Sequence, residues 1–107
     1  MLKIRQVTLV GGHFDGAKSF ASHATCIISR HVYVWDGGPD EDRFVEAKSL
    51  MYQMPEEDRA REQAMVRNLF RNTKALHHGQ SPLNPLKDIP EWRVNMWLEL
   101  FRYGVVE

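Results

Sequence analysis

Five histidines and one cysteine are the side chains of this chain best suited to bind a metal ion or to attack a substrate. His23 and Cys26 lie three residues apart, whereas a structural zinc site needs four ligands, usually as two close pairs. Positions three apart on a strand also point to opposite faces. His77 and His78 would project about 100° apart on a helix, an arrangement in which two histidines rarely bind one ion. We therefore expect no metal ion and no cofactor.

The candidate catalytic groups do not form a recognisable catalytic arrangement either. Cys26 is flanked by apolar and β-branched residues, which favours a buried, unreactive thiol rather than a nucleophile paired with His23 or His31. An acidic cluster follows a glycine turn, where carboxylates are usually solvated, and it comprises Asp36, Asp40, Glu41 and Asp42. No nucleophile and base stand in an arrangement that indicates a reaction, so the sequence predicts a protein that is not an enzyme.

A phosphate-binding loop is the third chemical possibility, because Gly11 and Gly16 are separated by four residues and follow a β-rich run. In such loops a lysine directly follows the second glycine and reaches the phosphates that the backbone N–H groups surround. In this chain Lys18 stands one position too far along, and Asp15 would place a negative charge among the phosphates. We expect the glycines, Gly12 included, to shape a turn through positive φ angles instead.

The same stretch, from Leu9 to Gly16, reads L-x-G-G-x-x-D-G. It resembles the opening of many small proteins encoded by phages and prophages. The resemblance implies a non-enzymatic accessory protein, made in the bacterial host cytoplasm during infection, that binds a host protein and inhibits or redirects it. Host defence systems are among the targets that the resemblance implies.

Length and composition set further limits on the class of protein. A chain of 107 residues corresponds to a single domain, 1–107, and 43% hydrophobic with 26% charged residues is typical of a folded globular protein. Fourteen basic residues balance fourteen acidic ones, which argues against a general binder of the nucleic-acid backbone. No apolar run is long enough to cross a membrane, and the lone cysteine without a signal peptide favours a reducing cytoplasm.

The N-terminal half has the composition of strands joined by turns. Residues 2–10 and 24–35 are rich in β-branched and aromatic residues, and a turn over 36–40 follows. Residues 29–31 either form a tight hairpin turn or lie in the middle of one long strand. Residues 43–54 alternate like a strand but contain helix-favouring residues, and we expect a strand antiparallel to the preceding one.

The C-terminal half is predicted to contain two helices. Pro55 and the acidic residues after it suit the start of a helix over residues 55–78. The second helix is expected from Asp88, as N-cap, to Tyr103, with Gly104 after its end. The expected fold is therefore α+β, a small antiparallel sheet packed against two C-terminal helices. The predicted buried face of the first helix consists of Met65, Leu69, Phe70 and Leu76, with Val66 at its edge.

The second of these helices carries the candidate partner-binding residues. Its apolar side chains outnumber the polar ones so far that one small sheet cannot cover them. We expect the first helix, a second copy of the chain or a foreign partner to cover the rest. The interface would have Trp97 or Phe101 near its centre and Arg93 or Arg102 at its rim.

A basic stripe offers an alternative function. Arg67, Arg71, Lys74 and His78 recur along one face of the first helix and could contact a nucleic-acid backbone or an acidic protein surface. The protein would then be a small nucleic-acid-binding protein. A third possibility is a virion or assembly component held by its last helix. The sequence leaves these functions, the oligomeric state and the identity of the target open.

Overall fold

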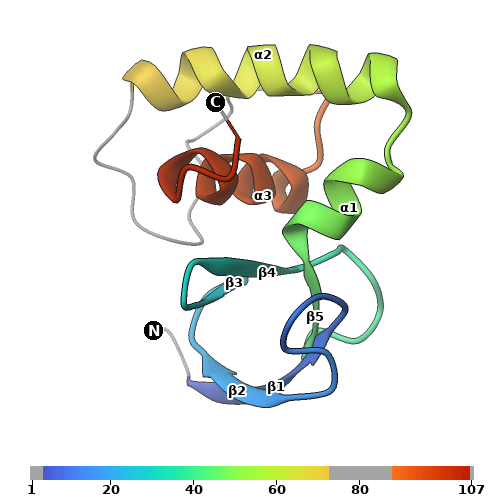
Figure 1. Cartoon of the computed structure of the whole chain (residues 1–107), viewed down its shortest axis with the longest axis vertical. Coiled ribbons are helices and arrows are strands. Elements are labelled where there is room, and N and C mark those ends of the chain that lie inside the picture. The colour runs from blue at the N-terminus through green and yellow to red at the C-terminus, as the bar shows by residue number, and fades with distance from the viewer. Residues whose placement is uncertain (1–3, 73–87, 107) are drawn as a thin grey trace.

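Five strands form one sheet in the N-terminal half of the chain, and helices follow them (Figure 1). The computed structural model describes residues 4–72 and 88–106. The α+β class expected from the sequence is confirmed, although the described residues contain three helices rather than two. The elements in chain order are β1 (Arg5–Val10), β2 (Lys18–Ala21), β3 (Thr25–Ile28), β4 (His31–Trp35), β5 (Arg43–Glu46), α1 (Ala47–Gln53), α2 (Glu56–Asn72) and α3 (Glu91–Arg102).

The strand order across the sheet is β2-β1-β5-β4-β3. Neighbouring strands are antiparallel with one exception, because β1 and β5 run parallel. This parallel pair was not expected from the sequence. It arises because strand direction alternates along the chain, so that the fifth strand runs the same way as the first. The parallel register joins Leu9 to Phe44.

The sheet curls until its two edge strands approach each other, as the ring of strands in Figure 1 shows. The Cys26 sulfur of β3 lies 3.5 Å from the Ser19 hydroxyl of β2, although the two strands are not neighbours in the sheet. Because successive strand residues point to opposite sides, Tyr33 faces the inside of the curl, whereas Val32 and Val34 face the helices. The inner core consists of Val7, Leu9, Ala21, Cys26, Tyr33 and Phe44.

The glycine-rich stretch packs against this inner core, and its expected role as a turn is confirmed. All three glycines of the loop 11–16 have positive φ angles. The Tyr33 hydroxyl donates a hydrogen bond to the Gly11 carbonyl (2.7 Å) and accepts one from the Phe14 N–H (3.0 Å). The Asp15 carboxylate accepts the Gly11 N–H at 2.7 Å. One buried tyrosine and one aspartate therefore hold the loop in place.

The link between β3 and β4 is a tight hairpin turn, one of the two alternatives that the sequence leaves open. Ser29 and Arg30 have φ angles of 47° and 69°, the left-handed values that a two-residue turn of type I′ requires. Ile28 and His31 pair directly on either side of them. A single long strand through these residues is therefore excluded.

The segment 43–54 is not the single strand that we expected. β5 occupies its first four residues and pairs antiparallel with β4, and α1 begins directly after it. Ala47 and Met51, four residues apart on α1, are both buried in the core beneath the helices. A helix is favoured here because one turn buries both side chains on the same face.

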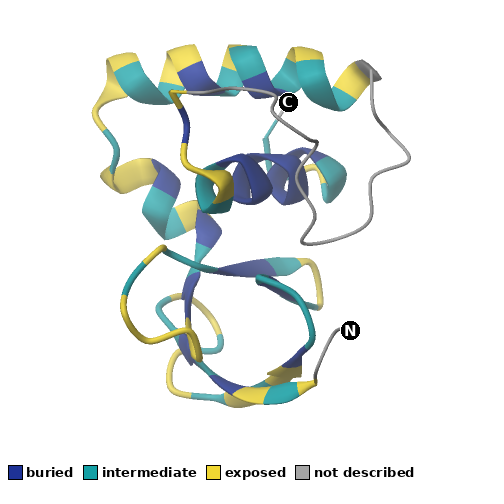
Figure 2. Ribbon diagram, turned by 180° about the vertical axis from the view of Figure 1, so that it is seen from behind, coloured by how far each residue is buried: buried dark blue, intermediate teal, exposed yellow. Residues whose placement is uncertain are grey.

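The helices form two layers over the outer side of β4. α1 and α3 pack against the sheet, and α2 lies beyond α3, away from the strands (Figure 1). α3 is buried at eight consecutive positions, from Val94 to Phe101, and Figure 2 shows it as the most deeply buried helix. The Trp92 ring packs against Gly37, where an added Cβ would lie 2.5 Å from the indole nitrogen.

None of the described helices has the length and apolar character that a membrane span requires.

α2 follows Pro55 as expected and spans Glu56–Asn72, whereas residues 73–78 of the expected helix, Leu76 among them, lie outside the described residues. Its buried face is shifted from the predicted one, because the fully buried positions are Glu62 and Val66. The predicted core positions are only partly buried, and these are Met65, Leu69 and Phe70. The shift arises because α2 meets α3 through a charged residue, which an apolar pattern does not reveal.

α3 begins later than expected. Pro90 rather than Asp88 is the N-cap, and no side chain caps this end. At the other end Gly104 has a φ of 70°, and its N–H and that of the next residue bond back to carbonyls of the last turn. This pair of bonds is the Schellman ending, so the expected end of the helix at this glycine is confirmed.

We expect Tyr33→Phe to lower the free energy of unfolding by about 1–3 kcal/mol, the cost of leaving buried backbone groups without a partner. The change removes the hydroxyl between Gly11 and Phe14 but keeps the ring in the inner core. Urea unfolding followed by circular dichroism measures the effect. Tyr52→Phe is the matched control, because Tyr52 is exposed and its change should cost less than about 0.5 kcal/mol. Equal losses in the two variants would contradict the role of the hydroxyl.

The same hydroxyl should make stability fall at alkaline pH. Burial raises the pKa of Tyr33 above its usual 10.0; the hydrogen bond from Phe14 opposes this, and the carboxylates of Glu46 and Asp15 add to the rise. A group whose pKa is higher in the folded state loses its contribution as the pH rises above the pKa of the unfolded state, here about 10. Above about pH 10, stability should therefore decline more steeply in the wild type than in Tyr33→Phe. Parallel curves would rule this out.

Candidate functional site

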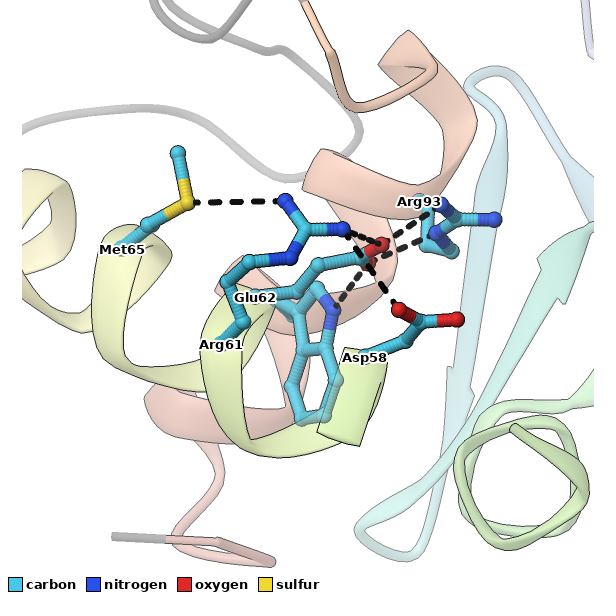
Figure 3. Close-up of polar contacts among 6 residues, drawn as sticks. Asp58, Arg61, Glu62, Met65 and Arg93 are labelled. Atoms are coloured by element: carbon cyan, nitrogen blue, oxygen red, sulfur yellow. Dashed lines mark hydrogen bonds and ion pairs between the residues drawn. The ribbon is translucent and has the colours of Figure 1, made fainter. Parts of the chain in front are cut away.

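Arg93 and Trp97, two of the residues expected at a partner interface, meet the buried carboxylate of Glu62 on α2. Figure 3 shows Arg93 directed at this carboxylate. Arg93 donates through Nε to Oε1 of Glu62 at 2.7 Å and through Nη2 to Oε2 at 2.6 Å. The indole N–H of Trp97 donates to the same Oε1 at 3.2 Å. These three side chains, termed the Glu62 cluster, join α2 to α3.

The electrostatics of the Glu62 cluster are those of a buried ion pair. Glu62 is fully buried, whereas the Arg93 side chain keeps 25% of its surface exposed. A second cation, Arg61, lies 3.9 Å from Glu62 and 3.8 Å from Asp58. Two guanidinium bonds and an indole bond satisfy the carboxylate, yet such a pair contributes little more net stability than an apolar pair would. The cluster therefore determines how α2 is positioned on α3 more than it strengthens the fold.

Apolar contacts continue this interface beside the Glu62 cluster. The Phe101 ring stacks on Trp97 with centroids 6.2 Å apart and on Phe70 of α2 at 5.9 Å. The Arg67 guanidinium of α2 lies over the same ring, 5.8 Å from its centroid. Phe101 is thus covered by α2 on the side where a partner was expected.

All four residues expected to bind a partner lie in or against the core of the chain itself. Trp97 and Phe101 are buried, and Arg93 is engaged by Glu62. Arg102, expected at the rim, pairs at 2.9 Å with the buried Glu99 on the same helix. The requirement for a cover over α3 was correct, and among the described elements α2 provides it. A role of these four residues in partner binding stays a prediction.

The basic stripe is placed only in part. Arg67 is half-buried over Phe101, whereas Arg71 is exposed near the end of α2. Lys74 and His78 lie outside the described residues. The structure therefore describes half of the stripe, and nucleic-acid binding by it stays a prediction.

The candidate metal and catalytic residues take part in structural contacts. Within residues 4–72 and 88–106, no three His, Cys, Asp or Glu side chains gather in a way that could hold a metal ion. Cys26 is buried in the inner core. Two carboxylates of the acidic cluster pair with arginines, Asp42 with Arg5 at 2.8 Å and Asp36 with Arg43 at 3.3 Å. These groups stabilise the turn that leads into β5.

A surface that the sequence analysis did not single out lies on the outer side of β1 and β2. Ile4, directly before β1, is 72% exposed, and Phe20 of β2 is 67% exposed. The register places Phe20 opposite Gln6 and places Thr8 between β2 and β5. Residues two apart on a strand point to the same side, so the strand side chains form one surface, and the exposed Ile4 directly precedes it. This surface is termed the β1–β2 face, and its residues are Ile4, Gln6, Thr8, Lys18, Phe20 and Arg43.

The alternation within β2 is the sequence feature that could have revealed the β1–β2 face. Ala21 is buried, so Phe20 beside it points outward, and Lys18 points the same way. Lys18 donates to the Thr8 hydroxyl at 2.6 Å. The lysine that resembled part of a phosphate-binding loop therefore belongs to this outer face.

We expect Glu62→Gln to lower the free energy of unfolding by about 3 kcal/mol, since it leaves the Arg93 charge partly buried without a carboxylate. The double variant Glu62→Met with Arg93→Met should return to within about 1 kcal/mol of the wild type, because an apolar pair has no charge to solvate. Arg61→Met is the control, since Arg61 is half-exposed and lies 3.8–3.9 Å from its carboxylates, so its ion pairs should contribute at most about 1 kcal/mol. Chemical denaturation compares the four proteins. A double variant no more stable than Glu62→Gln would contradict a buried ion pair.

With this geometry described, the chain can be compared with known proteins. No protein-family model, curated protein or solved structure matches it. Its function is therefore inferred from its own contacts and surfaces.

Proposed function

We propose that this protein is a non-enzymatic binding protein that contacts another protein through the β1–β2 face. The observation that carries the proposal is the exposure of Phe20 and Ile4 on one side of the same strand pair. Phe20 lies opposite Gln6, and Ile4 lies two residues from Gln6, a diagonal spacing that aromatic side chains can bridge. The two apolar groups therefore form one patch.

The energetic basis is the exposure of large apolar side chains on this face, whereas most described aromatic side chains are buried or half-buried. Tyr33, Phe44 and Trp97 are fully buried, in contrast to Phe20. Burying a side chain of this size contributes about 1.5–3 kcal/mol, which a partner with a matching pocket would gain. Aromatic residues are enriched at protein interfaces, and a strand holds this one at a fixed position before binding.

The charges on the β1–β2 face indicate the kind of partner. Its strand positions carry two cations, Lys18 and Arg43, and no carboxylate. Asp36 engages one Nη atom of Arg43, while 48% of that arginine side chain stays exposed. An acidic protein surface with an apolar pocket for Phe20 complements this arrangement. The two cations would speed its approach, most strongly at low salt.

The resemblance of residues 9–16 to the opening of phage proteins supports the second half of the proposal. It suggests that the partner is a bacterial host protein and that binding inhibits or redirects it. The glycine loop is not itself the proposed contact, because its backbone is held against the inner core by Tyr33. The proposed contact lies on the strands that this loop connects.

We expect Phe20→Ser to lose the partner and Tyr52→Ser to retain it. Both are exposed aromatic side chains, at 67% and 61%, but Tyr52 lies on α1, apart from the β1–β2 face (Figure 1). Immobilised wild type and variants are incubated with bacterial lysate, and the captured proteins are identified by mass spectrometry. A protein retained by the wild type and by Tyr52→Ser is then purified. Calorimetry should show that it binds Phe20→Ser at least about tenfold more weakly, as expected for a central interface residue.

Circular dichroism establishes that both variants fold before binding is compared. Equal affinity of the purified partner for the wild type and Phe20→Ser would refute the β1–β2 face as the interface. Salt-dependent binding of DNA or RNA that is lost in Arg71→Ala and kept in Phe20→Ser would instead favour the alternative function of the basic stripe.

A further inference from the structure

The described contacts of α2 are concentrated on α3. α2 is the outermost layer and packs chiefly against α3, more than against any other described element (Figure 1). Among residues 56–71, for which burial is described, only Glu62 and Val66 are fully buried. Its remaining apolar contacts come from side chains that stay partly exposed, namely Met65, Leu69 and Phe70. The described contacts that hold this helix on α3 include the buried Val66, the Glu62–Arg93 ion pair and half-buried side chains such as Phe70.

The ion pair does little to prevent α2 from moving away. When α2 is in place, Glu62 and Arg93 have lost their hydration and gained the ion pair. The cost of the first nearly cancels the gain from the second in free energy. When α2 moves away, both charges return to water, so no charge is left buried alone. Opening therefore differs from a substitution of Glu62, which leaves Arg93 without its partner. We expect a helix held in this way to open before the whole fold unfolds.

α3 beneath α2 has the features of a surface that binds a helix. Arg93, Trp97 and Phe101 follow one another at intervals of four residues and offer a guanidinium, an indole N–H and stacked rings. α2 shows what this surface accepts. It places a carboxylate at Glu62, an aliphatic side chain four residues later and the aromatic Phe70 four residues after that.

We propose that α2 is a displaceable cover and that the α3 surface of Arg93, Trp97 and Phe101 binds an amphipathic helix of another protein. That helix carries a carboxylate, an aliphatic residue and an aromatic residue at intervals of four, as α2 does. The carboxylate is required, because an occupant without one would bury Arg93 unpaired. α2 thus acts as an autoinhibitory ligand. This surface is separate from the β1–β2 face and does not depend on its function.

Hydrogen exchange in the full chain tests the opening. We expect amides of α2 to be protected at least about tenfold less than those of residues 94–101 in α3, because α2 opens without global unfolding. Val66→Ala should widen the difference by removing part of the anchor, whereas Glu57→Gln, at an exposed position, should not. Equal protection of α2 and α3 in the wild type would show that α2 leaves only on global unfolding and would overturn the proposal.

A fluorescein-labelled peptide with the sequence of residues 56–72 tests the surface. The full-length protein should bind it saturably, and Val66→Ala in the protein should tighten binding about fivefold or more, because the competing cover is weaker. In the peptide, Glu62→Gln should weaken binding at least about tenfold, whereas Glu57→Gln should not. Phe70→Ala in the protein replaces Val66→Ala if circular dichroism shows that the latter does not fold.

The outcomes of the peptide experiment separate the two surfaces. Binding that is insensitive to Glu62→Gln in the peptide, or to the weakened cover in the protein, would mean that the peptide does not take the place of α2 and would overturn the proposal. Phe20→Ser in the protein should leave peptide binding unchanged. Failure of the β1–β2 face as an interface is therefore distinguishable from failure of the displaceable cover.

Discussion

The rest of the structure depends on the need to cover α3, a helix that is apolar on nearly every side. Eight consecutive residues of it are buried, which is possible only when the helix lies between two layers. The outer side of the sheet supplies one layer, through Val32 and Val34 of β4. α2 supplies the other. The two layers of helices over one curled sheet follow from this requirement.

The outer layer meets α3 through a charge as well as through apolar contacts. A carboxylate that accepts from Arg93 and Trp97 has few alternative positions, so Glu62 fixes the register between the two helices. Replacing a buried ion pair by apolar residues of similar volume is often neutral for stability, so we attribute to this pair a role in the register of the two helices. The Glu62 cluster therefore explains how a mostly polar helix can occupy one defined place on α3.

Because the sheet is curled, side chains on its inner side are buried, whereas some on its outer side are exposed to solvent. Alternation directs Tyr33 inward, where its hydroxyl holds the glycine loop, and directs Phe20 outward, where no described side chain buries it. The loop that resembles phage proteins is thus part of the support, and the proposed contact lies on the strands beside it. Strands position a binding residue more rigidly than a loop would, which favours binding without a large loss of conformational freedom.

The sequence by itself determined the features that depend on neighbours along the chain. The glycine turn, the helix after Pro55 and the helix end at Gly104 follow from local backbone preferences, and the α+β class follows from where these patterns change. Periodicity shows which residues share a side of an element, but not what covers that side. The parallel pairing of β1 with β5, the exposure of Phe20 and the burial of Glu62 were therefore decided only by the tertiary structure. A glutamate in a polar helix has the pattern of a solvated residue until an arginine 31 positions away meets it in the folded chain.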